Sequence, residues 1–470
     1  MPVCSIPVLP VPAAEFDERL IDRNNRPVPR YTSYPTLDRF SESFDYGDYL
    51  QAIAGLRTRG VMQPLSLHLR IPFCASSCHF CTRQRVIDRS QARAELYLEY
   101  LKKEITLQGQ LFAGINRVSQ LHLGGGTPSA LDERQLAGLL DHVLRWFQLA
   151  RRDEGVYSIE VDPRTVTPAS VRGLRALGLN QVIFGVQDLD PAVLAAVNRP
   201  QDADAVLAAI AAAHDAGFDA VAVELQVGLP RQDAAGLRAT LARLDTVRPD
   251  RIAILEYEHA PHIHRNQRRI DARELPDGTQ RREMLALCLQ WLQEAGYVHI
   301  GLEQFALPSD ALARAQLQGR LQRNLLGYSS QAEMEMVACG LAAVGAVGAT
   351  YSQNVKTLDA YYNRLDRDTL PIGRGLRLGM DEMLRRLIIQ VLLCHFSLSM
   401  RAIEQAWPIG FAEYFARELE ALRAMQDEGL VTLEGDWLNV SAKGRLSIRQ
   451  VCAVFDRHYD GSKALAAGIY

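Results

Sequence analysis

The chain has 470 residues, of which 48% are hydrophobic and 23% charged, and its formal net charge at pH 7 is −3. This length suggests two or three domains with a large buried core. The charge balance excludes the broad positive field of nucleic-acid-binding proteins. No apolar run reaches the roughly 20 residues that cross a bilayer, and residues 1–12 do not resemble a signal peptide. We therefore expect a cytoplasmic protein with neither nucleic acid nor a membrane as partner.

The first 60 residues are rich in Pro, Arg and Tyr and are expected to form an arm on a larger body. From residue 61 to 310, short apolar runs alternate with amphipathic segments such as 204–216, which fits a helix. This alternation predicts parallel strands that curl into a complete or partial barrel, with ligands at the carboxyl ends of the strands. The predicted strands are 65–69, 120–123, 158–161, 181–185, 221–225, 251–255 and 298–301.

After residue 310 the pattern changes to helices, and residues 311–470 are expected to form a separate domain. Helices are predicted at 380–394 and 411–427. A hairpin is predicted at 430–440, turning at Glu434-Gly435-Asp436, with another helix from Ser441. This order resembles a small winged-helix-like accessory domain.

Three of the eight cysteines, Cys74, Cys78 and Cys81, share one octapeptide directly after the first predicted strand. In a reducing compartment such crowding indicates metal binding or redox chemistry more than disulfides. Three thiolates can hold three irons of a [4Fe–4S] cluster and leave the fourth iron open for S-adenosylmethionine. A structural zinc site with His79 or a distant fourth ligand stays open, although such sites usually carry paired C-x2-C units. The other five cysteines are interpreted as buried thiols or bystanders.

Polar residues follow or interrupt several other predicted strands. The segment Gly124–Pro128 follows the second strand, where glycines let a backbone approach a ligand and exposed amides can bind a carboxylate or amino group. Glu160, Gln187 and Glu224 lie within apolar strands. Polar groups there either point toward a ligand or face solvent, and both interpretations stay open.

The motif C-x3-C-x2-C near the end of a first barrel strand is the signature of the radical S-adenosylmethionine superfamily. More closely, the chain resembles the oxygen-independent coproporphyrinogen III oxidase family. The resemblance extends from Arg30-Tyr31-Thr32-Ser33-Tyr34-Pro35-Thr36 through Ile71-Pro72-Phe73-Cys74 to Ala442-Lys443-Gly444-Arg445. It implies an α/β fold: a partial TIM-like barrel of the radical SAM type with an N-terminal arm and a mainly helical C-terminal domain.

By this resemblance, Cys74, Cys78 and Cys81 hold the cluster. The arm residues Arg30, Tyr31 and Tyr34 are expected at the substrate, because a tetrapyrrole offers a flat apolar face and negative propionates. From the residues alone, simple packing of the arm is the favoured alternative. The residues that the resemblance places at S-adenosylmethionine are His68, Phe80, Gly125, Gly126, Thr127, Glu160, Gln187, Arg199, Glu224 and, as weaker candidates, Glu258 and Val347.

The implied reaction is the anaerobic oxidative decarboxylation of two propionates of coproporphyrinogen III to vinyl groups, which gives protoporphyrinogen IX. A 5′-deoxyadenosyl radical would start it, and the cofactors would carry the hard chemistry. A low-potential electron donor of the flavodoxin or ferredoxin type and a monomeric state are expected. Two alternatives stay open: a related radical enzyme with another reaction, such as methyl transfer, cyclopropanation or haem breakdown, and a haem-binding or haem-delivering protein.

The chain departs from the family's pattern close to the cysteines. The family usually has Tyr-x-His before Ile-Pro-Phe-Cys, and Gly followed by a fourth cysteine after the third. Three cysteines suffice for the cluster. The added positive charge of Arg70 and Arg83 is predicted either to help hold an anionic substrate or to raise the cluster's potential. The departing residues are His68, Arg70, Thr82, Arg83, Glu224 in place of Asp, and Gln304 in place of His.

Overall fold

The computed structural model describes residues 13–23, 28–58 and 63–460, which fall into two compact units. The barrel unit takes Arg39–Met284 and Glu333–Arg377. The second unit, here called the C-terminal unit, takes the described residues of Met1–Asp38, Leu285–Ala332 and Leu378–Gly468. The described residues among the first 60 are thus divided between the two units and do not form one arm.

Six parallel strands form the centre of the barrel unit, in the order β9-β8-β7-β6-β4-β1. All six were predicted from the sequence. Leu67, Leu69 and Leu123 are fully buried, as expected for the face of a parallel sheet that helices cover. The strands are β1 (Leu65–Ile71), β4 (Arg117–Gly125), β6 (Val156–Val161), β7 (Gln181–Gln187), β8 (Ala220–Val227) and β9 (Arg251–Glu256).

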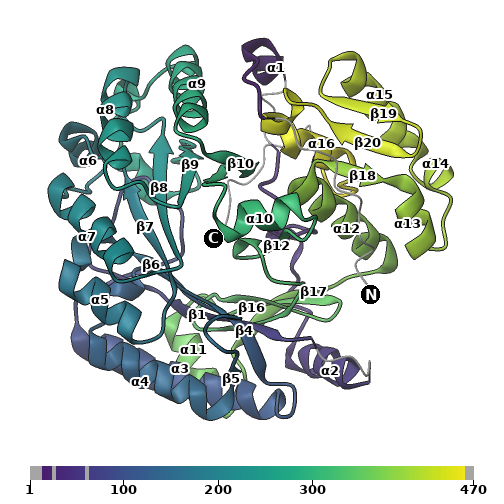
Figure 1. The fold of residues 1–470 in the computed structure, drawn as a ribbon. Coiled ribbons are helices and arrows are strands. Elements are labelled where there is room, and N and C mark those ends of the chain that lie inside the picture. Colours follow the sequence, from purple (N-terminus) through teal and green to yellow (C-terminus); the bar gives the residue numbers. More distant parts are fainter. Residues whose placement is uncertain (1–12, 24–27, 59–62, 461–470) are drawn as a thin grey trace. The chain divides into compact units, whose positions relative to one another are not determined.

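Helices connect these strands and lie along one face of the sheet (Figure 1). Their starts are set locally: Asp132 and Gln135 form a capping box at α4, and Thr167 caps α5 ahead of Pro168. Every crossover returns the chain to the same end of the sheet, so the carboxyl ends of the strands share one edge. The helices are α3 (Gln91–Leu111), α4 (Glu133–Trp146), α5 (Pro168–Ala176), α6 (Pro191–Ala196), α7 (Ala203–Asp215) and α8 (Ala234–Asp245).

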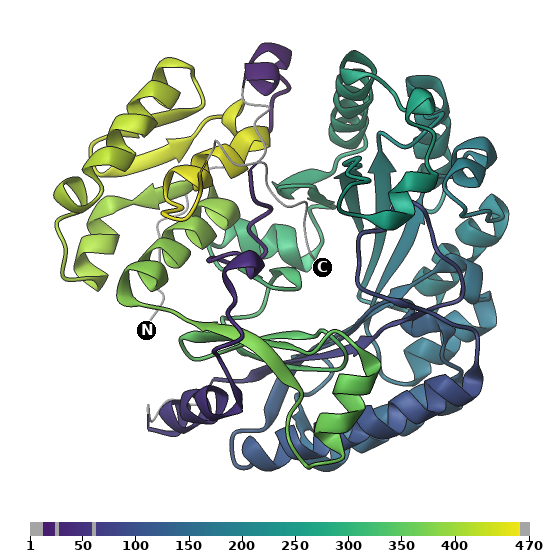
Figure 2. The same cartoon turned by 180° about the vertical axis from the view of Figure 1, so that it is seen from behind.

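The sheet continues beyond β1 with residues that sequence analysis assigned to the C-terminal domain. β14 (Glu335–Cys339) pairs in parallel with β1, and β15 (Val344–Val347), β16 (Thr350–Asn354) and β17 (Ile372–Arg377) follow antiparallel. The expected helical character is wrong for these four strands, because β14 depends on long-range pairing with β1 and the other three strands extend the sheet from β14. Helix α11 (Leu358–Leu365) lies beside α3 (Figure 2), and α2 (Tyr46–Arg57) packs near β15 and β16.

The C-terminal unit combines helices with a three-stranded sheet of order β18-β20-β19. The predicted hairpin is confirmed, but the predicted helix 411–427 is divided into two helices at Phe415. The last described α-helix begins at Ile448 instead of Ser441, and a short 3-10 helix, Gly444–Ser447, precedes it. Its elements are α12 (Met380–His395), β18 (Ser397–Ser399), α13 (Met400–Ala406), α14 (Phe411–Tyr414), α15 (Ala416–Asp427), β19 (Val431–Glu434), β20 (Trp437–Val440) and α16 (Ile448–Val454).

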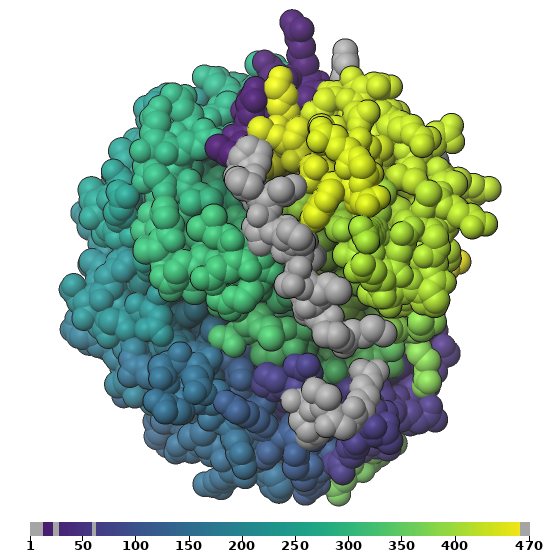
Figure 3. All heavy atoms as spheres, turned by 45° about the vertical axis from the view of Figure 1, so that its right-hand side comes forward, coloured from purple at the N-terminus to yellow at the C-terminus, as the bar shows by residue number. Residues whose placement is uncertain are grey.

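The same unit includes segments that are distant in sequence. Asp17 directly precedes helix α1 (Glu18–Arg23), and its Oδ2 accepts a hydrogen bond of 2.9 Å from Lys443 Nζ. This bond links the start of α1 to the chain between β20 and α16. In Figure 3 the yellow and yellow-green residues of the C-terminal helices form one continuous surface. The unit's further elements are β10 (Val298–Gly301), a predicted strand, β11 (Gln304–Ala306), α10 (Ala311–Leu317), β12 (Gln322–Asn324), β13 (Gly327–Ser329) and the end of α9 (Gly278–Glu294).

Over the described residues, no helix combines the length and the apolar character needed to cross a membrane. Of the five cysteines outside the octapeptide, Cys4 lies outside the described residues. The other four are buried thiols, as interpreted from the sequence: Cys288, Cys339, Cys394 and Cys452.

Candidate active site

The three clustered cysteines lie on one closed loop directly after β1. Cys74 ends β2 (Phe73–Cys74), which pairs in parallel with β3 (Val86–Ile87), and the amide of Asp88 donates to the carbonyl of Cys74 over 3.0 Å. The chain between the two short strands carries Cys78, which is buried, and Cys81, which is half-buried like Cys74. The loop therefore presents three thiols at the carboxyl end of a barrel strand, where barrel enzymes place their chemistry.

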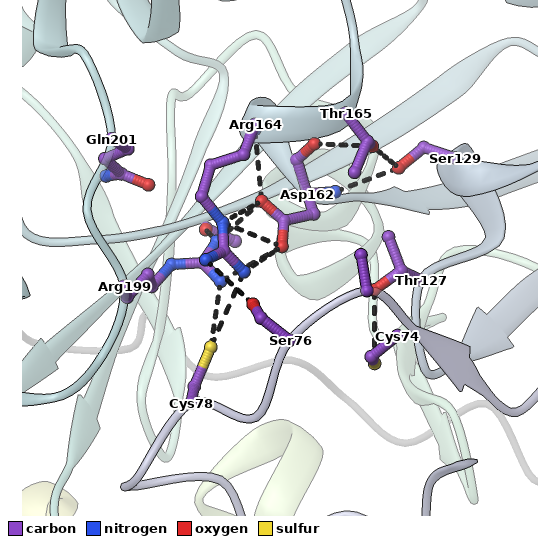
Figure 4. Close-up of polar contacts among 12 residues, drawn as sticks. Cys74, Ser76, Cys78, Thr127, Ser129, Asp162, Arg164, Thr165, Arg199 and Gln201 are labelled. Carbon is purple, nitrogen blue, oxygen red and sulfur yellow. Dashed lines mark hydrogen bonds and ion pairs between the residues drawn. The ribbon is translucent and has the colours of Figure 1, made fainter. Parts of the chain in front are cut away.

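Side chains from other strand ends donate hydrogen bonds to two of the three sulfurs (Figure 4). Thr127 Oγ1 lies 3.2 Å from Cys74 Sγ, while Arg199 Nη1 and Arg164 Nη2 lie 3.5 and 3.6 Å from Cys78 Sγ. Burial raises the pKa of the Cys74 thiol to about 11, against the opposing effect of Thr127. Ligation of iron therefore has to release a proton from this thiol, and the donors stabilise the thiolate that remains.

The three thiols of the loop are compatible with the predicted cluster. In an iron–sulfur cluster each thiolate binds a different iron, and Cys74, Cys78 and Cys81 supply three thiols from one loop. Among residues 13–23, 28–58 and 63–460, no group of three His, Cys, Asp or Glu side chains is arranged to hold a single metal ion.

The glycine segment after β4 holds the start of the cysteine loop. The amides of Gly126 and Thr127 donate to the carbonyls of Ile71 and Phe73, both over 2.7 Å, and the amide of Gly125 donates to Glu160 Oε2 over 3.2 Å. A Cβ on Gly126 would lie 2.6 Å from the backbone of residues 72 and 73. The expectation that these amides are exposed to a ligand is therefore wrong, because protein acceptors occupy them. The contact of this segment with S-adenosylmethionine stays a prediction.

Glu160, near the end of β6, is a carboxylate enclosed by cationic and polar groups. Arg83 Nη1 donates to its Oε2, and His122 Nε2 lies 3.6 Å from its Oε1. A hydrogen bond of 2.8 Å between His122 Nδ1 and Ser158 Oγ orients the imidazole. Burial alone would raise the pKa of Glu160, but the charge of Arg83 and the hydrogen bond from His122 hold it well below its usual range. Glu160 is therefore an anion at neutral pH.

Glu224 on β8 and Gln187 on β7 are two further polar residues toward the carboxyl ends of the parallel strands. Glu224 Oε1 lies 3.9 Å from Arg83 Nη2, and burial raises its pKa against the opposing charge of Arg83. Gln187 has a left-handed backbone with φ of 73°. Its Oε1 is buried and has no hydrogen-bond partner in the described part of the chain. An unpaired buried acceptor is costly, and the contact of Gln187 with S-adenosylmethionine stays a prediction.

Asp162, directly after β6, was not singled out from the sequence, nor was its partner Arg164. The Asp162 carboxylate binds Arg164 Nη2 at 2.6 Å and Arg199 Nη1 at 3.2 Å. Ser129 Oγ accepts from the Asp162 amide over 3.1 Å. The carboxyl-end rule that drew attention to Glu160 applies equally to Asp162 and Arg164, and was the available signal.

The two residues that depart from the family before Cys74 are both enclosed. The ring of His68 lies 5.4 Å from that of His122. Burial, reinforced by His122 and Arg70, lowers the pKa of His68 well below its usual range, so its imidazole is neutral. Arg70 Nη2 donates to the carbonyl of Gln84 over 2.6 Å. Arg70 thus ties β1 to the far side of the cysteine loop and is not an exposed site for an anion.

Phe80 and the two weaker candidates, Glu258 and Val347, lie in different parts of the barrel unit. Phe80 packs against a buried cluster that includes Val197 and Tyr257. Glu258 has an exposed side chain, and its carbonyl shares the donor Gln267 Nε2 with the carbonyl of Phe80, at 3.1 and 3.3 Å. Val347 is buried in β15, within the antiparallel extension of the sheet. Their contact with the cofactor stays a prediction.

The arm residues belong to the C-terminal unit. Tyr31 and Tyr34 are 3% and 2% exposed, and Tyr31 OH donates to Asp456 Oδ2 over 3.1 Å. Packing inside this unit therefore occupies both rings, as the alternative interpretation held, while Arg30 is exposed. Gln304 lies in β11 of the same unit. A substrate contact stays a prediction, and Arg30 is the member best exposed to make one.

This parallel sheet, with three thiols after its first strand and a glycine segment after its second, defines a radical S-adenosylmethionine enzyme. Residues 69–244 match the family model "Radical SAM superfamily" and residues 380–447 match "HemN C-terminal domain". The chain is 39% identical over 444 residues, 94% of its length and 96% of theirs, to the oxygen-independent coproporphyrinogen III oxidases of Salmonella typhimurium and Escherichia coli. The relative from Synechocystis is 37% identical.

A solved structure gives the same result. It is described as coproporphyrinogen III oxidase from Escherichia coli, a radical SAM enzyme, and matches with a TM-score of 0.90 and 38% identity over 95% of this chain and all of the other. The chain belongs to the oxygen-independent coproporphyrinogen III oxidase family. Its cofactors are accordingly a [4Fe–4S] cluster and S-adenosylmethionine, and the partial-barrel fold predicted from the sequence is confirmed.

Proposed function

We propose that this protein catalyses the oxygen-independent oxidative decarboxylation of two propionates of coproporphyrinogen III, giving protoporphyrinogen IX. The observation that carries the proposal is the intact three-thiol loop in a chain that matches enzymes of this name over 94% of its length. The absence of the family's fourth cysteine removes none of the three sulfurs that a cluster with one open iron needs.

The cluster and S-adenosylmethionine, when bound, supply a 5′-deoxyadenosyl radical. This chain's own residues bind and orient them. Cys74, Cys78 and Cys81 supply the thiolates. Ionised Glu160 offers an acceptor for ammonium or hydroxyl groups, and the buried Gln187 Oε1 offers a second. A rigid arrangement of this kind holds the reacting groups in place and limits the access of water.

The substrate and electron donor are assigned by the same proposal. Coproporphyrinogen III carries four propionates, and exposed Arg30 suits one of them, since a guanidinium pairs well with a carboxylate. A flavodoxin or ferredoxin is the expected donor, because reduction of such a cluster needs a low potential. The monomeric state and cytoplasmic location stay predictions.

Anaerobic reconstitution followed by turnover tests the proposal. The reconstituted protein, given S-adenosylmethionine, a reductant and coproporphyrinogen III, should form protoporphyrinogen IX together with methionine and 5′-deoxyadenosine. Formation of 5′-deoxyadenosine without protoporphyrinogen would assign the chain to a related radical enzyme with another substrate. Haem binding without any 5′-deoxyadenosine would favour a haem carrier and overturn the proposal.

A further inference from the structure

One carboxylate at the end of β6 holds two guanidiniums side by side (Figure 4). Arg164 approaches Asp162 in a fork, with Nε 3.0 Å from Oδ1 and Nη2 2.6 Å from Oδ2. Arg199 approaches the same two oxygens from its own side, with Nη2 and Nη1 each at 3.2 Å. The side chains of Asp162 and Arg199 are 11% and 6% exposed, and that of Arg164 is 20% exposed. Forked pairs of this kind fix the plane of the guanidinium.

Both guanidiniums also donate to the cysteine loop, and Arg199 Nη2 donates in addition to the carbonyl of Gly185 on β7. Arg164 Nη2 lies 3.6 Å from Cys78 Sγ, and its Nη1 donates to Ser76 Oγ over 3.2 Å. Arg199 Nη1 lies 3.5 Å from the same sulfur. The group therefore places two positive charges and one negative charge beside Cys78, a net charge of +1, in surroundings largely shielded from solvent.

The physical consequence concerns the electron that the cluster accepts. Reduction adds one negative charge, and positive charge and hydrogen bonds to the ligand sulfurs stabilise that charge. The stabilisation is larger in a partly buried site than in water, because the effective dielectric constant is lower there. Arg199 is already expected to contact S-adenosylmethionine, whereas nothing in the proposed function requires Arg164.

We propose that Arg164 is a positioning residue for the cluster: held by Asp162, its guanidinium donates to the Cys78 sulfur and raises the reduction potential of the bound cluster. The effect would make the first electron easier to supply from a physiological donor. The proposal rests on the cysteine loop holding the cluster. Its test needs neither S-adenosylmethionine nor a porphyrin, so failure of the proposed reaction would leave it standing.

The experiment is a redox titration of the reconstituted full-length protein, followed by the electron paramagnetic resonance signal of the reduced cluster. Arg164→Met keeps an unbranched apolar side chain and removes the charge and the donors. We expect about a tenfold lower ratio of reduced to oxidised cluster at a fixed ambient potential, a shift of about 59 mV for one electron. The matched control is Arg172→Met on α5, an exposed arginine, which should titrate like the parent protein.

An unchanged potential in an Arg164→Met protein with full iron content would overturn the proposal. If that variant loses iron, Arg164→Gln decides, because it also removes the charge while keeping a polar donor: a lowered potential supports the proposal and an unchanged one overturns it. Loss of iron from both variants, while Arg172→Met keeps its iron, would also overturn the proposal. Arg164 would then be needed for the folding of the loop and not for the reduction potential of the cluster.

Discussion

Arg83 forms an ion pair with Glu160, and this pair ties the residue two positions after Cys81 to the end of β6. The second guanidinium nitrogen of Arg83 lies 3.9 Å from Glu224, on β8. The family pattern described in the sequence analysis places a cysteine at position 83, whereas here Arg83 bridges the cysteine loop and two barrel strands. The cluster needs no ligand at position 83, and the ion pair of Arg83 stabilises the loop there.

The first prediction follows from that pair. Arg83→Met should lower the free energy of unfolding at pH 7 by about 1–2 kcal/mol, a value reduced from that of a fully buried pair because solvent partly screens it. Pairing depresses the pKa of Glu160, so its contribution is present above the unfolded value near 4.5 and is lost as the pH falls through the depressed folded value. The difference in the free energy of unfolding between variant and parent should therefore become smaller at acidic pH.

Urea unfolding of the iron-free protein between pH 2 and pH 8 measures this difference, because the loss begins only below the unfolded pKa near 4.5. Arg93→Met is the control, because Arg93 pairs with Asp88 at 2.7 Å but its side chain is 66% exposed. That variant should cost about 0–1 kcal/mol. Equal losses in the two variants would contradict the structural role assigned to Arg83.

A second prediction concerns the glycine segment. Gly126→Ala places a Cβ 2.6 Å from the backbone of Pro72 and Phe73, so the start of the cysteine loop has to shift at a cost of about 1–3 kcal/mol. We expect a lower melting temperature and a lower iron content after reconstitution. Gly138→Ala on α4, where no atom lies within 4 Å, should be stabilising by about 0.5–1 kcal/mol. Retention of full iron and stability in Gly126→Ala would refute the packing argument.

A third prediction uses Glu104, a fully buried carboxyl that accepts hydrogen bonds from the amide of Gly340, Asn354 Nδ2 and Tyr361 OH. Burial raises its pKa from 4.5 to about 7, against the effect of these donors. A raised carboxyl pKa means that ionisation destabilises the folded state, so this cost should appear as the pH rises from about 5 to 8. It amounts to about 3 kcal/mol at full ionisation.

Glu104→Gln removes the titrating group. Measured by urea unfolding, the stability of the parent protein relative to this variant should fall as the pH increases across that range. Parallel profiles for the two proteins would show that Glu104 does not titrate there.

A fourth prediction concerns the ligands themselves. Cys78→Ser should prevent stable incorporation of the cluster, because the proposed site supplies only three thiolates and the cluster needs all three. Iron analysis and the visible absorption band after anaerobic reconstitution measure the loss. The control is Cys288→Ala, at a buried thiol outside the motif, which should keep its iron. A Cys78→Ser protein with full iron content would rule out the cluster assignment.

A fifth prediction separates packing from substrate binding in the arm. Tyr31→Phe removes the hydrogen bond to Asp456 and should cost about 1 kcal/mol of stability while leaving the KM for coproporphyrinogen III unchanged. Arg30→Met, at an exposed site, should raise this KM and leave the melting temperature unchanged. The reverse pattern, with a raised KM only in Tyr31→Phe, would indicate that the Tyr31 side chain contacts the substrate.

The sequence by itself determined the parts of this protein that depend on local pattern. The alternation of apolar strands with helices predicted the six parallel strands, and the spacing of Cys74, Cys78 and Cys81 after the first strand predicted the cluster. Glu160 and Gln187 drew attention because a polar group inside an apolar strand needs a partner. Each of these signals lies within a few residues of the feature that it predicts.

The tertiary structure decided what depends on residues far apart in the chain. Only the fold shows that β14 joins the sheet beside β1, that Arg83 reaches Glu160 and that Tyr31 is buried against Asp456. It also brings Arg164 to Cys78, 86 residues away. Hydrogen bonds and ion pairs act over a few ångströms of space, whatever the separation of the residues along the chain. The spacing in the sequence therefore predicted the cysteine site, but only the folded structure shows which charged residues surround it.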